Sequence, residues 1–190
     1  VLERQNINWA SDHVTLSEEI NFVEAYLELQ SYRFGDRLRY EIELAEECMD
    51  YRISKLTLTT FVENSCVHGM EQKSATCWIY VRVYRKGKWL CMEIEDTGGG
   101  MEERVVEEMN VRMRECRIDD IKENEHVGII NACLRLKMIT KGNVTFSMES
   151  EIGVGTFMTI RADTDYLERK ERTKREEEGA AGYAESNADR

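Results

Sequence analysis

The hydrophobic pattern divides the chain into helical and strand segments, beginning with a capped helix. Thr15 and Glu18 have the T-x-x-E spacing of a capping box, which marks the start of a helix. Apolar residues then recur at helical spacing, at Leu16, Ile20, Val23, Tyr26 and Leu27. Gly35 is a typical stop signal, so the pattern predicts a helix over residues 16–33.

The next segments alternate between strand and helix patterns. Apolar and charged residues alternate over 38–44, which predicts a half-buried strand. Residues 54–68 are predicted to form a helix with Ser54 as its N-cap and Gly69 at its end. Residues 101–125 are charged and partly helical in pattern, and 127–138 have the pattern of a buried helix.

Two hairpins complete the pattern. Segments 77–83 and 90–94 alternate, and a two-residue turn at Lys86–Gly87 lets both apolar sets face one core. This turn predicts that residue 83 pairs with 90 and 81 with 92. Strands near 143–150 and 156–162 are predicted to flank a turn at 151–155. Together the segments predict an α+β fold, a two-layer sandwich with helices on one face of a mixed, largely antiparallel sheet.

The chain divides into three parts by composition. Residues 1–35 are a lead-in segment, 36–162 hold the alternating strands and helices of the domain, and 163–190 are charged and poor in apolar residues. Chains of that last composition bury too little apolar surface to fold, so we expect 163–190 to be a solvated, mobile tail.

Composition narrows the classes of function. The 190 residues suit one domain, and 42% hydrophobic residues are enough for a core. A net charge of −11 repels nucleic-acid phosphates, so we expect no nucleic-acid partner. The six cysteines form no C-x-x-C pair and are expected to be free thiols in a reducing compartment. No stretch approaches the about 18 apolar residues of a membrane span. Because the first residue is Val, we expect a fragment of a longer protein.

Polar groups interrupt the apolar helix over 54–68. Asn64 and His68 are four residues apart and share a helix face, and Glu63 lies beside Asn64. An amide oxygen suits Mg²⁺, and a neighbouring carboxylate can act as a base or orient water. The same pattern also fits the surface face of an amphipathic helix, and this segment alone does not decide between the two.

Glycines gather at three other places. Asp96-Thr97-Gly98-Gly99-Gly100 follows a strand, so the backbone can approach a ligand closely, and the carboxylate can accept a hydrogen bond from an exocyclic amine. Gly128 opens an apolar helix whose free amides favour phosphate. Gly153-Val154-Gly155-Thr156 lies in the second hairpin turn. Each motif has an ordinary structural explanation as a connection, a helix start or a turn.

The order of these motifs resembles the ATP-binding domain of sensor histidine kinases, in the GHKL group of ATP-binding folds, and especially the LytS/YesM-type subfamily. The resemblance covers roughly residues 14–162. Segment 62–69 (VENSCVHG) is similar to the N box, and 96–101 (DTGGGM) to the first glycine box. Segment 128–136 (GIINACLRL) is similar to the second glycine box, and 153–156 (GVGT) to the closing motif.

The resemblance implies roles around ATP and Mg²⁺. Asn64 is expected to coordinate Mg²⁺ at the ATP phosphates, Glu63 to act as the base or water-orienting carboxylate, and His68 to lie near the phosphates. Asp96 is expected to bind the adenine amine, with Thr156 supporting the adenine side.

The remaining implied roles frame the pocket. Gly98, Gly100, Gly128 and Asn131 are expected to line the nucleotide site, and residues 101–127 to form its lid. The transfer itself would depend on positioning and charge neutralisation.

The sequence departs from the family pattern at five positions. Ser54 and Thr60 replace prolines, and Val67 replaces a basic residue of the N box. Thr97 replaces an asparagine, and His126 replaces the first glycine of the second glycine box, which is expected to stiffen the lid hinge. Val67 and His126 favour an alternative: a degenerate nucleotide-binding or partner-docking module without kinase activity.

The resemblance also implies partners outside the chain. The family phosphorylates a histidine in a His-Phe-x-x-Asn context, and none of His13, His68 and His126 has that context. We therefore expect the phosphoacceptor helix to lie outside the fragment, with residues 1–35 leading in from it. A response regulator would act downstream, and the parent protein would be anchored in the bacterial cell membrane with this domain in the cytoplasm.

Overall fold

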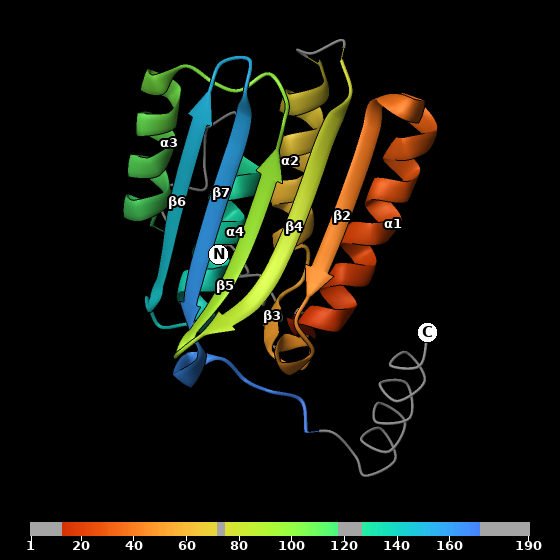
Figure 1. The fold of residues 1–190 in the computed structure, drawn as a ribbon. Coiled ribbons are helices and arrows are strands. Elements are labelled where there is room, and N and C mark those ends of the chain that lie inside the picture. Colours follow the sequence, from red (N-terminus) through yellow and green to blue (C-terminus); the bar gives the residue numbers. More distant parts are fainter. Residues whose placement is uncertain (1–12, 72–74, 118–126, 172–190) are drawn as a thin grey trace, which may run out of the picture.

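A five-stranded sheet forms one layer of the fold. The computed structural model describes residues 13–71, 75–117 and 127–171 (Figure 1). Within them the sheet order is β2-β4-β5-β7-β6. The strands are β2 (Leu38–Leu44), β4 (Cys77–Lys86), β5 (Trp89–Asp96), β6 (Val144–Glu151) and β7 (Gly155–Asp163). Only the β2–β4 pair of this sheet is parallel, so the sheet is mixed and largely antiparallel.

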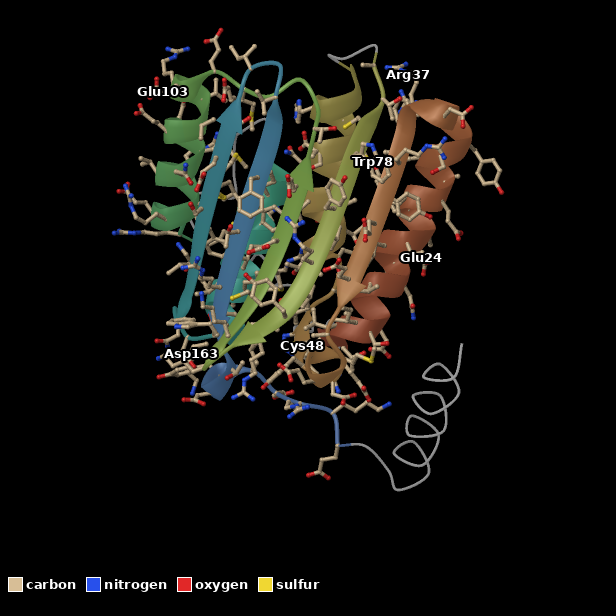
Figure 2. The ribbon with its side chains drawn as sticks, viewed as in Figure 1. Glu24, Arg37, Cys48, Trp78, Glu103 and Asp163 are labelled. Atoms are coloured by element: carbon tan, nitrogen blue, oxygen red, sulfur yellow. The ribbon has the colours of Figure 1, made fainter. Side chains whose placement is uncertain are left out.

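Helices form the second layer. Figure 1 shows α1 (Leu16–Phe34), α2 (Thr57–Glu71) and α4 (Val127–Ile139) on one face of the sheet, while α3 (Glu103–Glu115) packs beside β6. No described helix covers the other face, where side chains such as that of Trp78 project from the strands (Figure 2). The core lies between the layers, where Leu27, Val81 and Ile160 are fully buried. The predicted α+β sandwich is confirmed.

Short elements join these layers. The strands β1 (His13–Thr15) and β3 (Arg52–Ser54) pair as a small antiparallel sheet. The described ranges also contain the 3₁₀ turns η2 (Gly35–Arg37), η3 (Glu46–Cys48) and η5 (Thr164–Tyr166). The capping box of α1 is present as predicted: the Glu18 amide donates to Thr15 Oγ1 at 3.2 Å, and the Thr15 amide donates to Glu18 Oε2 at 2.8 Å.

The predicted boundaries of α2 were wrong at both ends. Ser54 ends β3 instead of capping the helix, which begins at Thr57 and continues through Gly69 to Glu71. Leu56 has a φ of +61°, and this left-handed residue turns the chain from strand into helix. Thr57 Oγ1 donates to the Ser54 carbonyl at 2.6 Å, so the hydroxyl of the first helical residue ties the two elements together.

The predicted register of the first hairpin was shifted by two residues. Val83 pairs with Met92 and Val81 with Ile94, and the turn is Gly87–Lys88. Both registers place the apolar sets on one face, so hydrophobic alternation does not separate them. Gly87 has a φ of +61°, which glycine tolerates at the first position of a tight hairpin turn.

The chain after β7 packs on the domain for several residues, contrary to the expectation of a tail from 163. Leu167 is buried, and the Arg52 amide donates to the Glu168 carbonyl at 2.8 Å. The Lys170 amide donates to the Asp50 carbonyl at 2.9 Å. The apolar residue at 167 and these backbone contacts hold 164–170 in place despite the surrounding charges. Residues 172–190 lie outside the described part.

Candidate functional site

The polar and glycine motifs lie at one end of the sandwich. The C-terminal half of α2, the loop after β5 and the β6–β7 turn meet at the upper end of Figure 1, opposite the end marked by Asp163 in Figure 2. The antiparallel pairing of β5 with β7 places Asp96 opposite Thr156, so two motifs far apart in sequence are joined by the sheet register.

A cavity of about 380 Å³ opens at this end. Asn64 and His68 of α2 and Gly100 of the glycine-rich loop lie on its wall, so three predicted site residues are brought together. The rest of the wall is mainly apolar and comes from the loop, α3, α4, β6 and the β6–β7 turn: Met101, Val105, Met109, Ile129, Met148 and Ile152. An apolar slot with a few polar groups suits a flat organic ring with a polar extension.

Asp96 lies next to this cavity but is not one of the residues on its wall. The residue is 5% exposed, and its Oδ1 accepts a 2.9 Å hydrogen bond from the Gly98 amide. Ser65 and the Thr156 amide also hydrogen-bond the carboxylate. Burial raises the pKa of Asp96, and these hydrogen bonds partly oppose the rise. A carboxylate has about four acceptor sites, so three donors leave room for one more.

Close backbone packing explains two of the glycines. A Cβ at Gly98 would overlap the Cα of Gly69 on α2, so the loop and the helix touch where neither has a side chain. Gly100 has a φ of +67°, and a Cβ there would overlap the Glu151 carbonyl. The Gly153 amide donates to the Gly99 carbonyl at 2.7 Å. The glycine-rich loop is therefore held between α2 and the β6–β7 turn.

Ser150 joins the loop to the closing motif. Its Oγ accepts a 3.0 Å hydrogen bond from the Met101 amide and donates to the Gly155 carbonyl at 2.8 Å. It also lies 2.9 Å from Oγ1 of Thr156. Thr156 is therefore held by a hydroxyl pair beside Asp96, away from the wall of the cavity.

Three other predicted site residues do not line this cavity. Glu63 and Gly128 are exposed and Asn131 is half-buried, and none of the three is on the cavity wall. Gly128 begins α4 close to α2, since a Cβ there would lie 3.3 Å from Cγ2 of Thr60. Residues 118–126 of the expected lid, including His126, lie outside the described residues. Helix α3 belongs to the described part of the lid segment and contributes to the cavity wall.

Sequence reasoning missed two groups of site residues. The apolar wall residues of α3 and β6 have ordinary core spacing, so no local signal separates them from the core. Ser65 and Ser150 are common residue types; the packing of α2 brings Ser65 to Asp96, and the β6–β7 pairing brings Ser150 to Thr156. The sequence offered one indication that Ser65 belongs to the site: it directly follows Asn64 in the segment similar to the N box.

The described residues outside this cavity were not predicted to bind metal, and they contain no metal-binding cluster of side chains. Among residues 13–71, 75–117 and 127–171, no group of three or more His, Cys, Asp or Glu side chains is placed to hold a metal ion. All six cysteines are buried and free, as predicted. Burial raises the pKa of Cys66, beside the site on α2, to about 12, which keeps that thiol protonated at neutral pH. Within the described part, no helix has the length and apolar character to cross a membrane.

Sequence comparison connects the chain to sensor histidine kinases. A family model described as histidine kinase matches residues 2–38. The sensor histidine kinase YesM of Bacillus subtilis is 32% identical over 106 residues, which are 56% of this chain and 18% of YesM. The sensor protein LytS of Bacillus anthracis is 26% identical over 147 residues, 77% of this chain and 24% of LytS. The chain thus spans about a fifth of the length of these curated relatives.

Solved structures agree with the fold. The catalytic domain of histidine kinase ThkA has a TM-score of 0.54 at 14% identity, covering 80% of this chain and 94% of that one. The histidine kinase domain of the blue-light activated kinase of Erythrobacter litoralis has a TM-score of 0.53 at 12% identity, covering 80% and 62%. The chain is therefore similar in sequence to sensor histidine kinases and in fold to their catalytic domains, which confirms the resemblance that its asparagine and glycine motifs predicted.

Proposed function

We propose that this chain is the ATP-binding catalytic part of a sensor histidine kinase, and that it transfers the γ-phosphate of ATP to a histidine outside residues 1–190. One observation carries the proposal: Asn64, His68 and the glycine-rich loop share one largely apolar cavity beside the buried carboxylate of Asp96. The apolar wall suits the purine ring, and the polar residues of α2 suit the phosphates.

Each end of the nucleotide has candidate partners. The free acceptor site of Asp96 suits the exocyclic amine of adenine. The Thr156 amide hydrogen-bonds that carboxylate from β7, and Ser150 of β6 pairs with the Thr156 hydroxyl. The amide oxygen of Asn64 would hold Mg²⁺, and His68 on the same helix face would lie near the phosphates. Glu63, exposed beside Asn64, would serve as the base or water-orienting carboxylate.

The residues present fit a weakly held Mg²⁺ ion. Because no cluster of metal-binding side chains occurs in the described part, the ion would rely on Asn64 and on the phosphates of the nucleotide. Mg²⁺ commonly binds proteins in this way, through one or two side chains plus substrate phosphates. Mg²⁺ would neutralise charge on the phosphates, while the chain supplies position and a slot that excludes water.

A degenerate nucleotide-binding or partner-docking module is the alternative. Two observations favour it: Asp96 is 5% exposed and lies off the cavity wall, and Val67, 37% exposed, replaces the basic residue of the N box. Under this alternative, the full-length protein binds ATP but does not label its own histidine.

A phosphotransfer assay separates the two functions. The chain is mixed with γ-labelled ATP, Mg²⁺ and a separately expressed acceptor-helix fragment of the parent protein. We expect acid-labile label on the acceptor histidine, and none when the acceptor histidine is replaced by alanine. ATP binding without any labelling of the acceptor would favour the docking module and contradict the kinase proposal.

The parent protein supplies the remaining partners. We propose that the acceptor helix belongs to the same or a partner subunit, that a response regulator receives the phosphoryl group, and that the parent is anchored in the cell membrane with this domain on the cytoplasmic side. The similarity to sensor proteins named LytS and YesM supports these assignments.

A further inference from the structure

Glu19 is a buried carboxylate that reaches from one helix to the start of another. It lies in the first turn of α1 and is 0% exposed. Its Oε2 accepts a 2.8 Å hydrogen bond from the Leu56 amide. Its Oε1 accepts from the amide and the hydroxyl of Thr59, at 3.1 and 3.2 Å. These three hydrogen bonds of the Glu19 side chain all go to the start of α2.

These contacts replace a local cap. The first amides of a helix have no partners within the helix and need an acceptor from elsewhere. Ser54 cannot supply one, because it ends β3, and the left-handed Leu56 separates it from the helix. The negative charge of Glu19 also suits the positive end of the α2 dipole. Glu19 of α1 therefore caps α2, although it lies 40 residues before Thr59 in the sequence.

A contribution to stability alone does not explain a buried carboxylate at this position. Burial raises the pKa of Glu19, and its hydrogen bonds to Thr59 and Leu56 oppose the rise, so the carboxylate carries a desolvation cost. What three fixed hydrogen bonds provide is a defined position for the helix start relative to α1. Asn64 lies five residues after Thr59, about one and a half turns along the same helix. A shift of the helix start is therefore carried to Asn64 and His68 on the cavity wall.

We infer that Glu19 is a positioning residue of the nucleotide site: its carboxylate fixes the start of α2 on α1 and thereby sets where Asn64 lies in the cavity. The inference rests on the proposed function for its consequence, because Asn64 is the residue proposed to hold Mg²⁺. Under this inference, the position of Asn64 depends on α1, which leads into the domain from the N-terminal side.

Glu19→Gln is the test variant and Glu18→Gln its matched control. An amide offers one oxygen where the carboxylate offers two, so the variant loses either the Leu56 or the Thr59 contact. Glu18 is the neighbouring glutamate, but it caps α1 and does not reach α2. Both variants keep the size of the side chain and remove one negative charge.

Nucleotide affinity gives the first readout. We expect Glu19→Gln to weaken Mg·ATP binding about tenfold, equal to about 1.4 kcal/mol, and to change adenosine binding by less than about twofold, because adenosine lacks the phosphates that depend on Asn64. Glu18→Gln should leave both affinities at the wild-type level. Equal losses for the two ligands, or no loss for Mg·ATP, would overturn the inference.

A double-mutant cycle and a nucleotide-free measurement complete the test. In an Asn64→Ala background, Glu19→Gln should weaken ATP binding no further, and additive losses would contradict action through Asn64. Without nucleotide, the NMR signals of the Asn64 side-chain amide should shift in Glu19→Gln and not in Glu18→Gln. An unshifted Asn64 signal in Glu19→Gln refutes the positioning role. If that signal shifts in Glu19→Gln but the wild type never binds Mg·ATP, the positioning role stands and the proposed function is refuted.

Discussion

Gly98 of the glycine-rich loop packs directly on Gly69 of α2, with no room for a side chain between them. The contact joins the predicted N box to the predicted first glycine box, and it sits beside the carboxylate of Asp96. Both glycines therefore have a packing reason, and the contact fixes the distance between the helix that carries Asn64 and the loop that lines the cavity.

Gly98→Ala should separate these two elements. The new Cβ would overlap backbone atoms of Gly69, which cannot move without shifting α2, so we expect destabilisation of about 1–3 kcal/mol together with weaker ATP binding. Chemical denaturation measures the first and titration calorimetry the second. Gly69→Ala is the comparison, because its Cβ would lie 3.2 Å from Oδ1 of Asp96 instead of overlapping backbone atoms, and it should cost less. A larger loss at Gly69 than at Gly98 would contradict this packing.

Asp96→Asn should separate stability from function. The raised pKa of Asp96 means that the folded protein holds this proton more tightly than the unfolded chain does. Its contribution to stability is complete below the ordinary pKa of about 4 and is lost as pH rises through the raised pKa. The neutral amide lacks this loss, so the stability of the variant relative to the wild type should rise with pH, while the variant binds ATP more weakly.

Thermal unfolding of wild type and Asp96→Asn between pH 4 and pH 8 measures the difference. Glu19, whose pKa is also raised by burial, contributes a similar slope in both proteins, so the difference between the two curves isolates Asp96. Parallel curves would show that the Asp96 carboxylate has the same proton affinity in the folded and the unfolded chain. In the wild type, ATP should also outcompete GTP, since GTP lacks the exocyclic amine at the position that Asp96 is proposed to bind.

Asn64→Ala should remove Mg²⁺-dependent ATP binding and leave the fold intact. Asn64 is half-buried on the cavity wall, so truncation should change stability by less than about 1 kcal/mol. Asn143→Ala, in the turn at the opposite end of the sheet, controls for the loss of an asparagine. Retained phosphotransfer in Asn64→Ala would refute the role of this residue.

Leu167→Ala tests the packing of the segment after β7. Leu167 is 8% exposed, so its truncation should cost about 2–4 kcal/mol in the free energy of unfolding. Glu168→Ala, which keeps the backbone bond from Arg52 and removes an exposed side chain, should cost little. Equal stability of Leu167→Ala and wild type would restore the expectation of a solvated tail from residue 163.

Local patterns predicted most elements and missed the contacts between distant segments. The capping box of α1 and the alternation in β2 are properties of neighbouring residues, and both were predicted correctly. The start of α2 was not, because its cap comes from Glu19 on another helix. The hairpin register failed for a related reason: alternation fixes the buried face, whereas the turn at Gly87 fixes the pairing.

The site shows the same division. Asn64, His68 and Gly100 were predicted from motifs and share the cavity, but its apolar wall is assembled from α3, α4 and β6, whose residues look like ordinary core positions in sequence. Ser150 was not predicted as a site residue because serine is a common residue type, although the predicted second hairpin already places it opposite Thr156. Assignments of individual roles to Glu63, Gly128 and Asn131 remain predictions that rest on the resemblance.

Calorimetric titration of the chain with ATP tests the central claim most directly. The proposed site predicts saturable binding of one ATP per chain, weakened when Mg²⁺ is removed with a chelator and lost in Asn64→Ala. A folded wild-type protein that shows no saturable binding of Mg·ATP at millimolar concentration would contradict the claim that this cavity is a nucleotide site.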